Sequence, residues 1–229
     1  MRRTASIVIR GAFNPLIFHP LWFAESQLIG SDEAKKATEH NGIKILHPDV
    51  TIWELDWLNI QVSKERFAAT VKAEPYERVH DLVVGAFTVL IHTPLRLVGI
   101  NLETVFSAES AKHYHAIGDT LAPKSCWAAL LGEFNAEKRA GGLRELVMEH
   151  SPRADGLKGY IRTKVAPTPE DNFDVLVEVN DHIEVAKEPV TPGADPLNAR
   201  DVLDIIQAHW LTSQKRSQAI TDSIQAIGK

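Results

Sequence analysis

Three segments in the second half of the chain alternate apolar and polar residues, and this alternation constrains the fold more than any other feature. The segments run over Leu143–Ser151, Leu157–Val165 and Phe173–Val185. The stretches between them, Pro152–Asp155 and Pro167–Asp171, are rich in turn-forming residues. Alternation with a period of two is typical of strands buried on one face only. The sequence therefore predicts a three-stranded antiparallel meander.

The two faces of this meander differ in composition. The apolar face collects Leu146, Met148, Leu157, Ile161, Phe173, Val175, Val177 and Val179. The polar face collects Glu145, Glu149, Lys158, Tyr160, Arg162, Lys164, Asp174 and Glu178. Opposite charges directly across an antiparallel pair stabilise that register modestly. Charge pairing therefore predicts a register with the facing pairs Glu149–Lys158, Glu145–Arg162 and Lys164–Asp174.

The first half of the chain reads as alternating strands and helices. Its clearest element is a helix over Pro75–His92, in which apolar residues from Val79 to Leu90 form one continuous stripe. A shorter helix is expected over Pro20–Ile29. The expected strands are Ser6–Ala12, Val50–Val62, Arg66–Lys72 and Leu97–Phe106. This order, βαββαβ, resembles the ferredoxin-like arrangement.

The rest of the chain adds two helices and two irregular segments. We expect a helix over Ala108–Leu121, capped by Ser107, and a long C-terminal helix from Asn198 to about Ile227. Asn135–Gly142 is polar and ends in glycine, which divides the chain into a ferredoxin-like half, 1–134, and a half with the meander and C-terminal helix, 135–229. The predicted class is α+β, with helices on one face of antiparallel sheet. Whether the two halves form one continuous domain stays open at this point.

Composition narrows the functional classes. The 229 residues carry a formal net charge of −5, which gives no general attraction to nucleic acid or anionic lipid. No uninterrupted apolar run reaches the roughly 18 residues that a membrane helix needs. The single cysteine, Cys126, excludes an internal disulfide and fits a reducing compartment. We therefore expect a cytoplasmic protein that does not associate with membranes.

Catalytic motifs are absent from the sequence. It contains no GxGxxG, GxxxxGK[ST], HExxH, GxSxG or CxxC pattern. This absence predicts no cofactor and no dedicated metal site. The best candidates for chemistry are histidines near carboxylates. His115 and Asp119, at i and i+4 on the expected helix beside His113, can share a proton or a metal, and Asp181 is placed to orient His182.

Large aromatic side chains suggest a second kind of site. Trp22 and Phe23 belong to a short, strongly apolar helix, and Trp53 and Trp57 lie four apart on an expected strand, hence on one face. On the C-terminal helix, Trp210 lies at roughly helical spacing with Ile220, Ile224 and Ile227, among many polar residues. Core packing is the ordinary role of such residues. The sharper hypothesis is a protein interface or a hydrophobic ligand pocket.

A row of cations on the expected middle strand of the meander suggests a third hypothesis. Lys158, Tyr160, Arg162 and Lys164 lie on one face, an arrangement able to hold single-stranded nucleic acid. Carboxylates on the neighbouring strands favour a surface charge ladder instead, so nucleic-acid binding is the less favoured interpretation.

The sequence therefore predicts a non-enzymatic binding or assembly protein that forms a homodimer and has another protein as a further candidate partner. Exposed sheet edges that need a partner support this prediction. A metal-dependent or histidine-based enzyme is the main alternative, and a nucleic-acid-binding module is the second.

Overall fold

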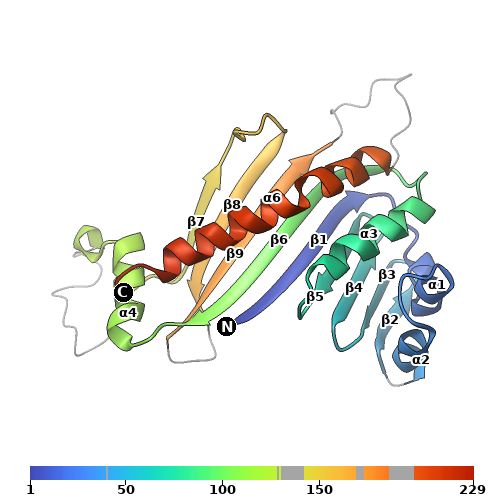
Figure 1. The fold of residues 1–229 in the computed structure, drawn as a ribbon, viewed down its shortest axis with the longest axis horizontal. Helices are drawn as coiled ribbons and strands as arrows, with labels where there is room; N and C mark the ends of the chain where they lie inside the picture. Colours follow the sequence, from blue (N-terminus) through green and yellow to red (C-terminus); the bar gives the residue numbers. More distant parts are fainter. Residues whose placement is uncertain (40, 128, 130–141, 169–172, 186–198) are drawn as a thin grey trace.

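A computed structural model describes residues 1–39, 41–127, 129, 142–168, 173–185 and 199–229. Nine strands form one antiparallel sheet in the order β2-β3-β4-β5-β1-β6-β9-β8-β7 (Figure 1). Their bounds are β1 Arg2–Gly11, β2 Ile43–His47, β3 Val50–Glu54, β4 Leu58–Ser63, β5 Arg66–Val71, β6 Leu95–Ser107, β7 Leu146–His150, β8 Gly159–Pro167 and β9 Asp174–Glu184. The α+β class and the antiparallel sheet are confirmed.

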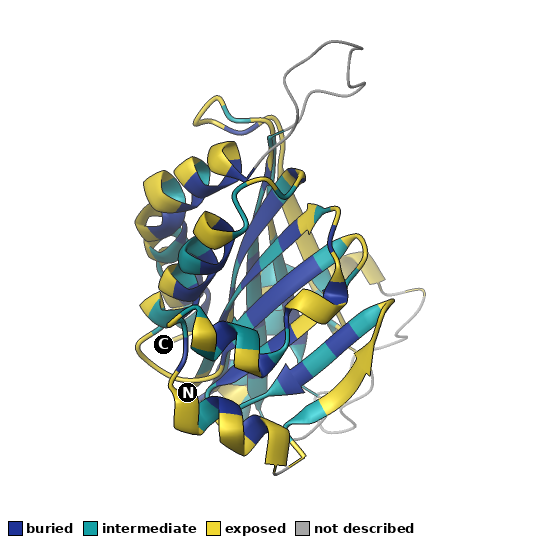
Figure 2. Cartoon of the chain, turned by 90° about the vertical axis from the view of Figure 1, so that its right-hand side faces the viewer, coloured by how far each residue is buried: buried dark blue, intermediate teal, exposed yellow. Residues whose placement is uncertain are grey.

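Helices α3 and α6 lie side by side across one face of this sheet (Figures 1 and 2). The helices are α1 Pro20–Glu25, α2 Ser31–Glu39, α3 Glu77–Val89, α4 Ala111–Leu121 and α6 Arg200–Gln225, with short 3-10 turns η1 Pro15–Ile17 and η2 Lys124–Trp127. The long C-terminal helix predicted from the sequence is therefore present. Helix α4 is capped by the Ser110 hydroxyl rather than by Ser107, because Ser107 still belongs to β6.

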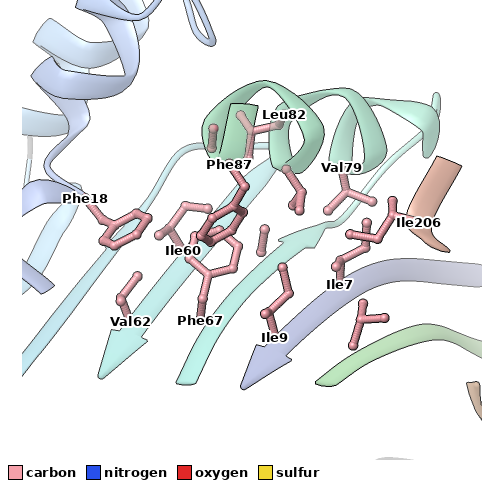
Figure 3. Close-up of a cluster of buried hydrophobic side chains, with 14 of the residues drawn as sticks. Ile7, Ile9, Phe18, Ile60, Val62, Phe67, Val79, Leu82, Phe87 and Ile206 are labelled. Atoms are coloured by element: carbon pink, nitrogen blue, oxygen red, sulfur yellow. The ribbon is translucent and has the colours of Figure 1, made fainter. Parts of the chain in front are cut away.

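The main core lies between α3, α6 and the central strands. Figure 3 shows Phe87 of α3 pointing toward Ile60 and Phe67 on the strands below it. The Phe67 and Phe87 rings meet edge to face with centroids 5.0 Å apart. Ile206 brings α6 into the same cluster. A smaller cluster at the far end joins α4 to the end of α6 through Ile117, Ile224 and Phe106.

The ferredoxin-like order does not match the observed order of elements. Four strands, rather than two, lie between α2 and α3, because Ile43–His47 forms β2 and the segment predicted as Val50–Val62 divides into β3 and β4. The missed turn, 55–57, has Asp56 as its one turn-favouring residue. The inward positions Trp53 and Leu58 flank this turn and are both fully buried. Because apolar residues lie on both sides of the turn, the sequence alternation over Val50–Val62 does not show where β3 ends and β4 begins.

The meander has the predicted strands and faces but a different register. Glu149 pairs with Arg162, and Lys164 pairs with Glu178 on the other side. The predicted pairs assumed a tight turn after Ser151. The actual β7–β8 connection is longer because the buried side chain of Arg153 holds it against β9.

One sheet unites the two predicted halves of the chain. Strand β6 pairs with β1 on one side and with β9 over eleven residue pairs on the other. Most of the proposed boundary, 135–142, and the proposed linker, 187–195, lie outside the described residues.

Candidate functional site

The two histidines of α4 do not form a catalytic or metal site with Asp119. His113 is buried, its Nδ1 accepts a hydrogen bond from the Glu109 N–H at 3.1 Å, and its Nε2 lies 3.1 Å from the Gln225 carbonyl, to which it donates. Both ring nitrogens are therefore occupied, Nδ1 at the start of α4 and Nε2 in joining α4 to the end of α6. His115 is exposed, and Asp119 pairs with Lys124 at 2.8 Å. The geometry does not join His113, His115 and Asp119 into one centre.

His182 and Asp181 point to opposite faces of β9, so Asp181 does not orient the imidazole. The His182 ring stacks on Tyr160 across the β8–β9 pair, with centroids 4.2 Å apart and an interplanar angle of 7°. Burial lowers the pKa of His182, and the partial compensation from Glu184 does not reverse the shift. The neutral ring is favoured, which suits stacking more than proton transfer near neutral pH.

This shift gives a pH prediction. Because the folded-state pKa of His182 lies below that of the unfolded chain, the unfolded chain binds more protons, and stability falls as the pH drops below about 6.5. We expect His182→Phe, which keeps the stacking, to reduce that loss between pH 7.5 and 5.5 in urea unfolding. His115→Phe, at an exposed position, is the matched control and should leave the wild-type pH dependence unchanged.

The predicted aromatic set divides between the core and one surface hollow. Phe23 and Trp53 are fully buried, and the Trp53 Nε1 donates to the Phe18 carbonyl at 2.7 Å. Trp210 is a buried residue of α6. Trp22 is partly buried and packs edge to face on Phe23. These four side chains belong to the core.

Trp57 differs, because it lies in the turn before β4 and not on a common strand face with Trp53. Its Nε1 donates to Glu33 Oε1 at 2.7 Å, and the Arg78 guanidinium lies 3.3 Å from its ring centroid. Trp57, Glu33 and Arg78 line a hollow of about 620 Å³ between the α1–α2 connection and α3. The three side chains hold α2, the β3–β4 turn and α3 together. Trp57 is therefore the one predicted pocket residue that lines a described hollow in the structure.

The cation row of β8 is largely neutralised. The Arg162 guanidinium binds Glu149 at 2.6 Å and lies 4.4 Å from the Tyr160 ring centroid. Lys164 binds Glu145 at 2.9 Å. Lys158 is exposed at the start of the strand. The row is a charge ladder in which each of the two central cations has its own carboxylate.

A buried ion cluster on the other face of β9 was missed by sequence reasoning. Asp181 accepts hydrogen bonds from Arg153 on the β7–β8 connection and from Arg216 on α6, and from the Ser213 hydroxyl at 2.5 Å. Arg153 also binds Asp155, with Nε 2.9 Å from its carboxylate. The available signal was a charged residue at an inward position of an otherwise apolar strand face.

The charges of this cluster balance. Burial alone would lower the pKa of the Arg153 guanidinium, but the hydrogen bonds that it donates to Asp155 and Asp181 raise that pKa. The Arg153 hydrogen bond lowers the pKa of Asp155 to about 2. Two cations and two carboxylates therefore satisfy each other, and this cluster fastens the β7–β8 connection and α6 to β9.

Beside the cluster, the outer edge of the sheet is open. A hollow of about 360 Å³ lies between β7, β8 and α6, with Met148, His150, Ile161, Thr163, Arg216 and Ile220 among its lining residues. Strand β7 is the last strand of the sheet, so one of its edges has no strand partner among the described residues. Met148 is 63% exposed and Val147 is 46% exposed on this strand. We call the free side of Leu146–His150 the β7 edge.

Within the described residues, no three His, Cys, Asp or Glu side chains are grouped as a metal site requires. None of the described helices has the length and apolarity to cross a membrane. No protein-family model matches the sequence, and no curated protein matches it significantly.

Proposed function

We propose that this chain is a non-enzymatic assembly protein that forms a homodimer through the β7 edge. The observation that carries the proposal is an edge strand without a strand partner in the described part of the chain, with exposed apolar side chains on both of its faces, Val147 on one and Met148 on the other. Unpaired edges recruit further strands unless charges, bulges or covering elements block them. The charged groups of this edge, such as Glu149, are already bound inward to β8.

The pairing that we propose is antiparallel around a twofold axis at Met148. Each Met148 then faces its counterpart, Leu146 faces His150, and Val147 faces Glu149. An isologous contact of this kind uses one patch twice and closes on itself. It places no carboxylate opposite another carboxylate.

The opposite edge of the sheet, β2, is less suited to pairing. Its register with β3 shifts between Ile43 and Ile45, while Lys44 between them is paired inward with Glu54 of β3 at 3.1 Å. Such a bulge is one of the features that protect natural edges. Ile45 is nonetheless 42% exposed, which makes it a matched control for Met148.

The test is the mass in solution by sedimentation equilibrium. We expect a species of about twice the 25.4 kDa chain mass. Met148→Lys would bring two ammonium groups together at the twofold axis and weaken the dimer at least tenfold, or about 1.4 kcal/mol. Ile45→Lys should leave the dimer intact. A monomeric wild type at micromolar concentration, or equal weakening by both variants, would refute the proposal.

The other functions remain weaker proposals. An enzyme built on His113, His115, Asp119 or His182 lacks a convergent set of groups, since His113, Asp119 and His182 are engaged separately and His115 is exposed. Nucleic-acid binding by Lys158, Tyr160, Arg162 and Lys164 is disfavoured by the carboxylates that pair two of these cations. A cytoplasmic location and a second protein partner belong to the same proposal as the homodimer. The single cysteine supports the cytoplasmic location.

A further inference from the structure

Two arginines face each other on the polar face of the sheet. Arg10 of β1 and Arg66 of β5 are direct partners in the antiparallel register. The Gly11 N–H donates to the Glu65 carbonyl, so Gly11 and Glu65 form a hydrogen-bonded pair. The adjacent pair, Arg10 and Arg66, is therefore of the type whose side chains approach more closely.

Neither arginine has a carboxylate partner among the described residues. Across the sheet, Ser63 faces Arg66 and Leu97 faces Arg10. Glu184 faces Leu97 in turn, two strands from Arg10 and hence about 10 Å away along the sheet. The pair contrasts with Arg162 on the same face, which has its own carboxylate in Glu149.

This juxtaposition is unfavourable in the free protein. Like charges directly opposite each other destabilise a strand pair. Arg66 is partly buried, and both this burial and the charge of Arg10 lower the pKa of its guanidinium. An anion placed between the two guanidinium groups would remove the repulsion and gain charge-assisted hydrogen bonds.

The surface next to the pair is closely packed. One step along the strands, Ala68 and Gly99 are buried, and Val8 between them is partly buried. The next row is polar, and in it the Asn101 Nδ2 donates to Ser6 Oγ at 3.3 Å. The side-chain oxygens of Asn101 and of Asn180 beside it are buried without a hydrogen-bond partner.

We infer that Arg10 and Arg66 form a binding site for the phosphate group of a small soluble phosphomonoester. Two planar guanidinium groups offer paired N–H donors to a tetrahedral oxyanion, and their two positive charges match a phosphate dianion. The organic part of the ligand stays in solvent, because Ala68 and Gly99 beside the pair are buried. This site lies on central strands, away from the β7 edge, and does not depend on the homodimer.

The test is thermal unfolding at pH 8 with glycerol 3-phosphate as the probe. The reference contains glycerol and sodium chloride at the same ionic strength. We expect 20 mM probe to raise the wild-type Tm by about 3 °C, the shift that saturation near ten times Kd gives a chain of this size. The same measurement on Met148→Lys keeps this result separate from the oligomeric state, and the shift should persist there.

Variants of Arg10 and Arg66 test whether the Tm shift with the probe depends on these two arginines. Arg66→Gln should raise the Tm without probe by about 2 °C at low ionic strength, because it relieves the repulsion, and should abolish the shift with probe. Arg10→Gln should do the same. Arg162→Gln, the matched control on the same face, should keep the probe shift. Three results would overturn the proposal. They are a wild-type Tm that does not change with the probe, a probe shift that persists in Arg66→Gln, or an Arg66→Gln chain that is less stable than the wild type.

Discussion

Asp181→Ala is expected to lower the free energy of unfolding by about 3–5 kcal/mol, because it leaves buried positive charge without its partner. The side chains of Arg153 and Asp181 are 0% and 2% exposed, so water cannot replace the lost contact. The Ser213 hydroxyl, only 2.5 Å from the Asp181 carboxylate, loses its acceptor as well. Urea unfolding followed by circular dichroism measures the change.

The control for this prediction is Glu178→Ala on the same strand. Glu178 lies on the polar face, directly opposite Glu103 of β6. Burial and the charge of Glu178 both raise the pKa of Glu103, so removal of Glu178 relieves a repulsion. We expect a change within about 0.5 kcal/mol, as for an ordinary surface substitution. A loss from Asp181→Ala no larger than the change from Glu178→Ala would mean that the ion cluster does not hold α6 to the sheet.

Trp53→Ala is the second large effect, with an expected loss of about 3–5 kcal/mol of unfolding free energy. The indole is 0% exposed and packs edge to face on Phe23 with centroids 5.2 Å apart. Its removal opens a cavity and also leaves the Phe18 carbonyl without the indole N–H that it accepts. Denaturant unfolding at equilibrium measures this loss.

Trp57→Ala is the matched comparison, because Trp57 is close in sequence but only partly buried. It should cost about 1–2 kcal/mol, from lost contact with Arg78 and a lost hydrogen bond to Glu33. Trp53 would then belong to the core and Trp57 to the surface hollow. Equal losses in the two variants would contradict this division of the predicted aromatic set.

The candidate sites were predictable only where local sequence carries the information. The charge ladder on β8 follows from alternation, because side chains two residues apart on a strand share a face. The same rule places Asp181 and His182 on opposite faces. The partners of Asp181 could not be read from the sequence, since Arg153 and Arg216 come from separate elements, 28 and 35 residues away. The Arg10–Arg66 pair likewise depends on strands far apart in the chain.

The sequence by itself determined the stripe of α3 and the faces of the meander, whose apolar pattern repeats without interruption, and it also determined the presence of the long C-terminal helix. Periodicity reports which side of an element is buried, because the apolar side must leave water. Only the tertiary structure decided the strand order, the register of β7 on β8 and the union of both halves in one sheet. These features depend on contacts between distant segments, such as β6 with β9 and Arg153 with Asp181, and no local pattern specifies such contacts.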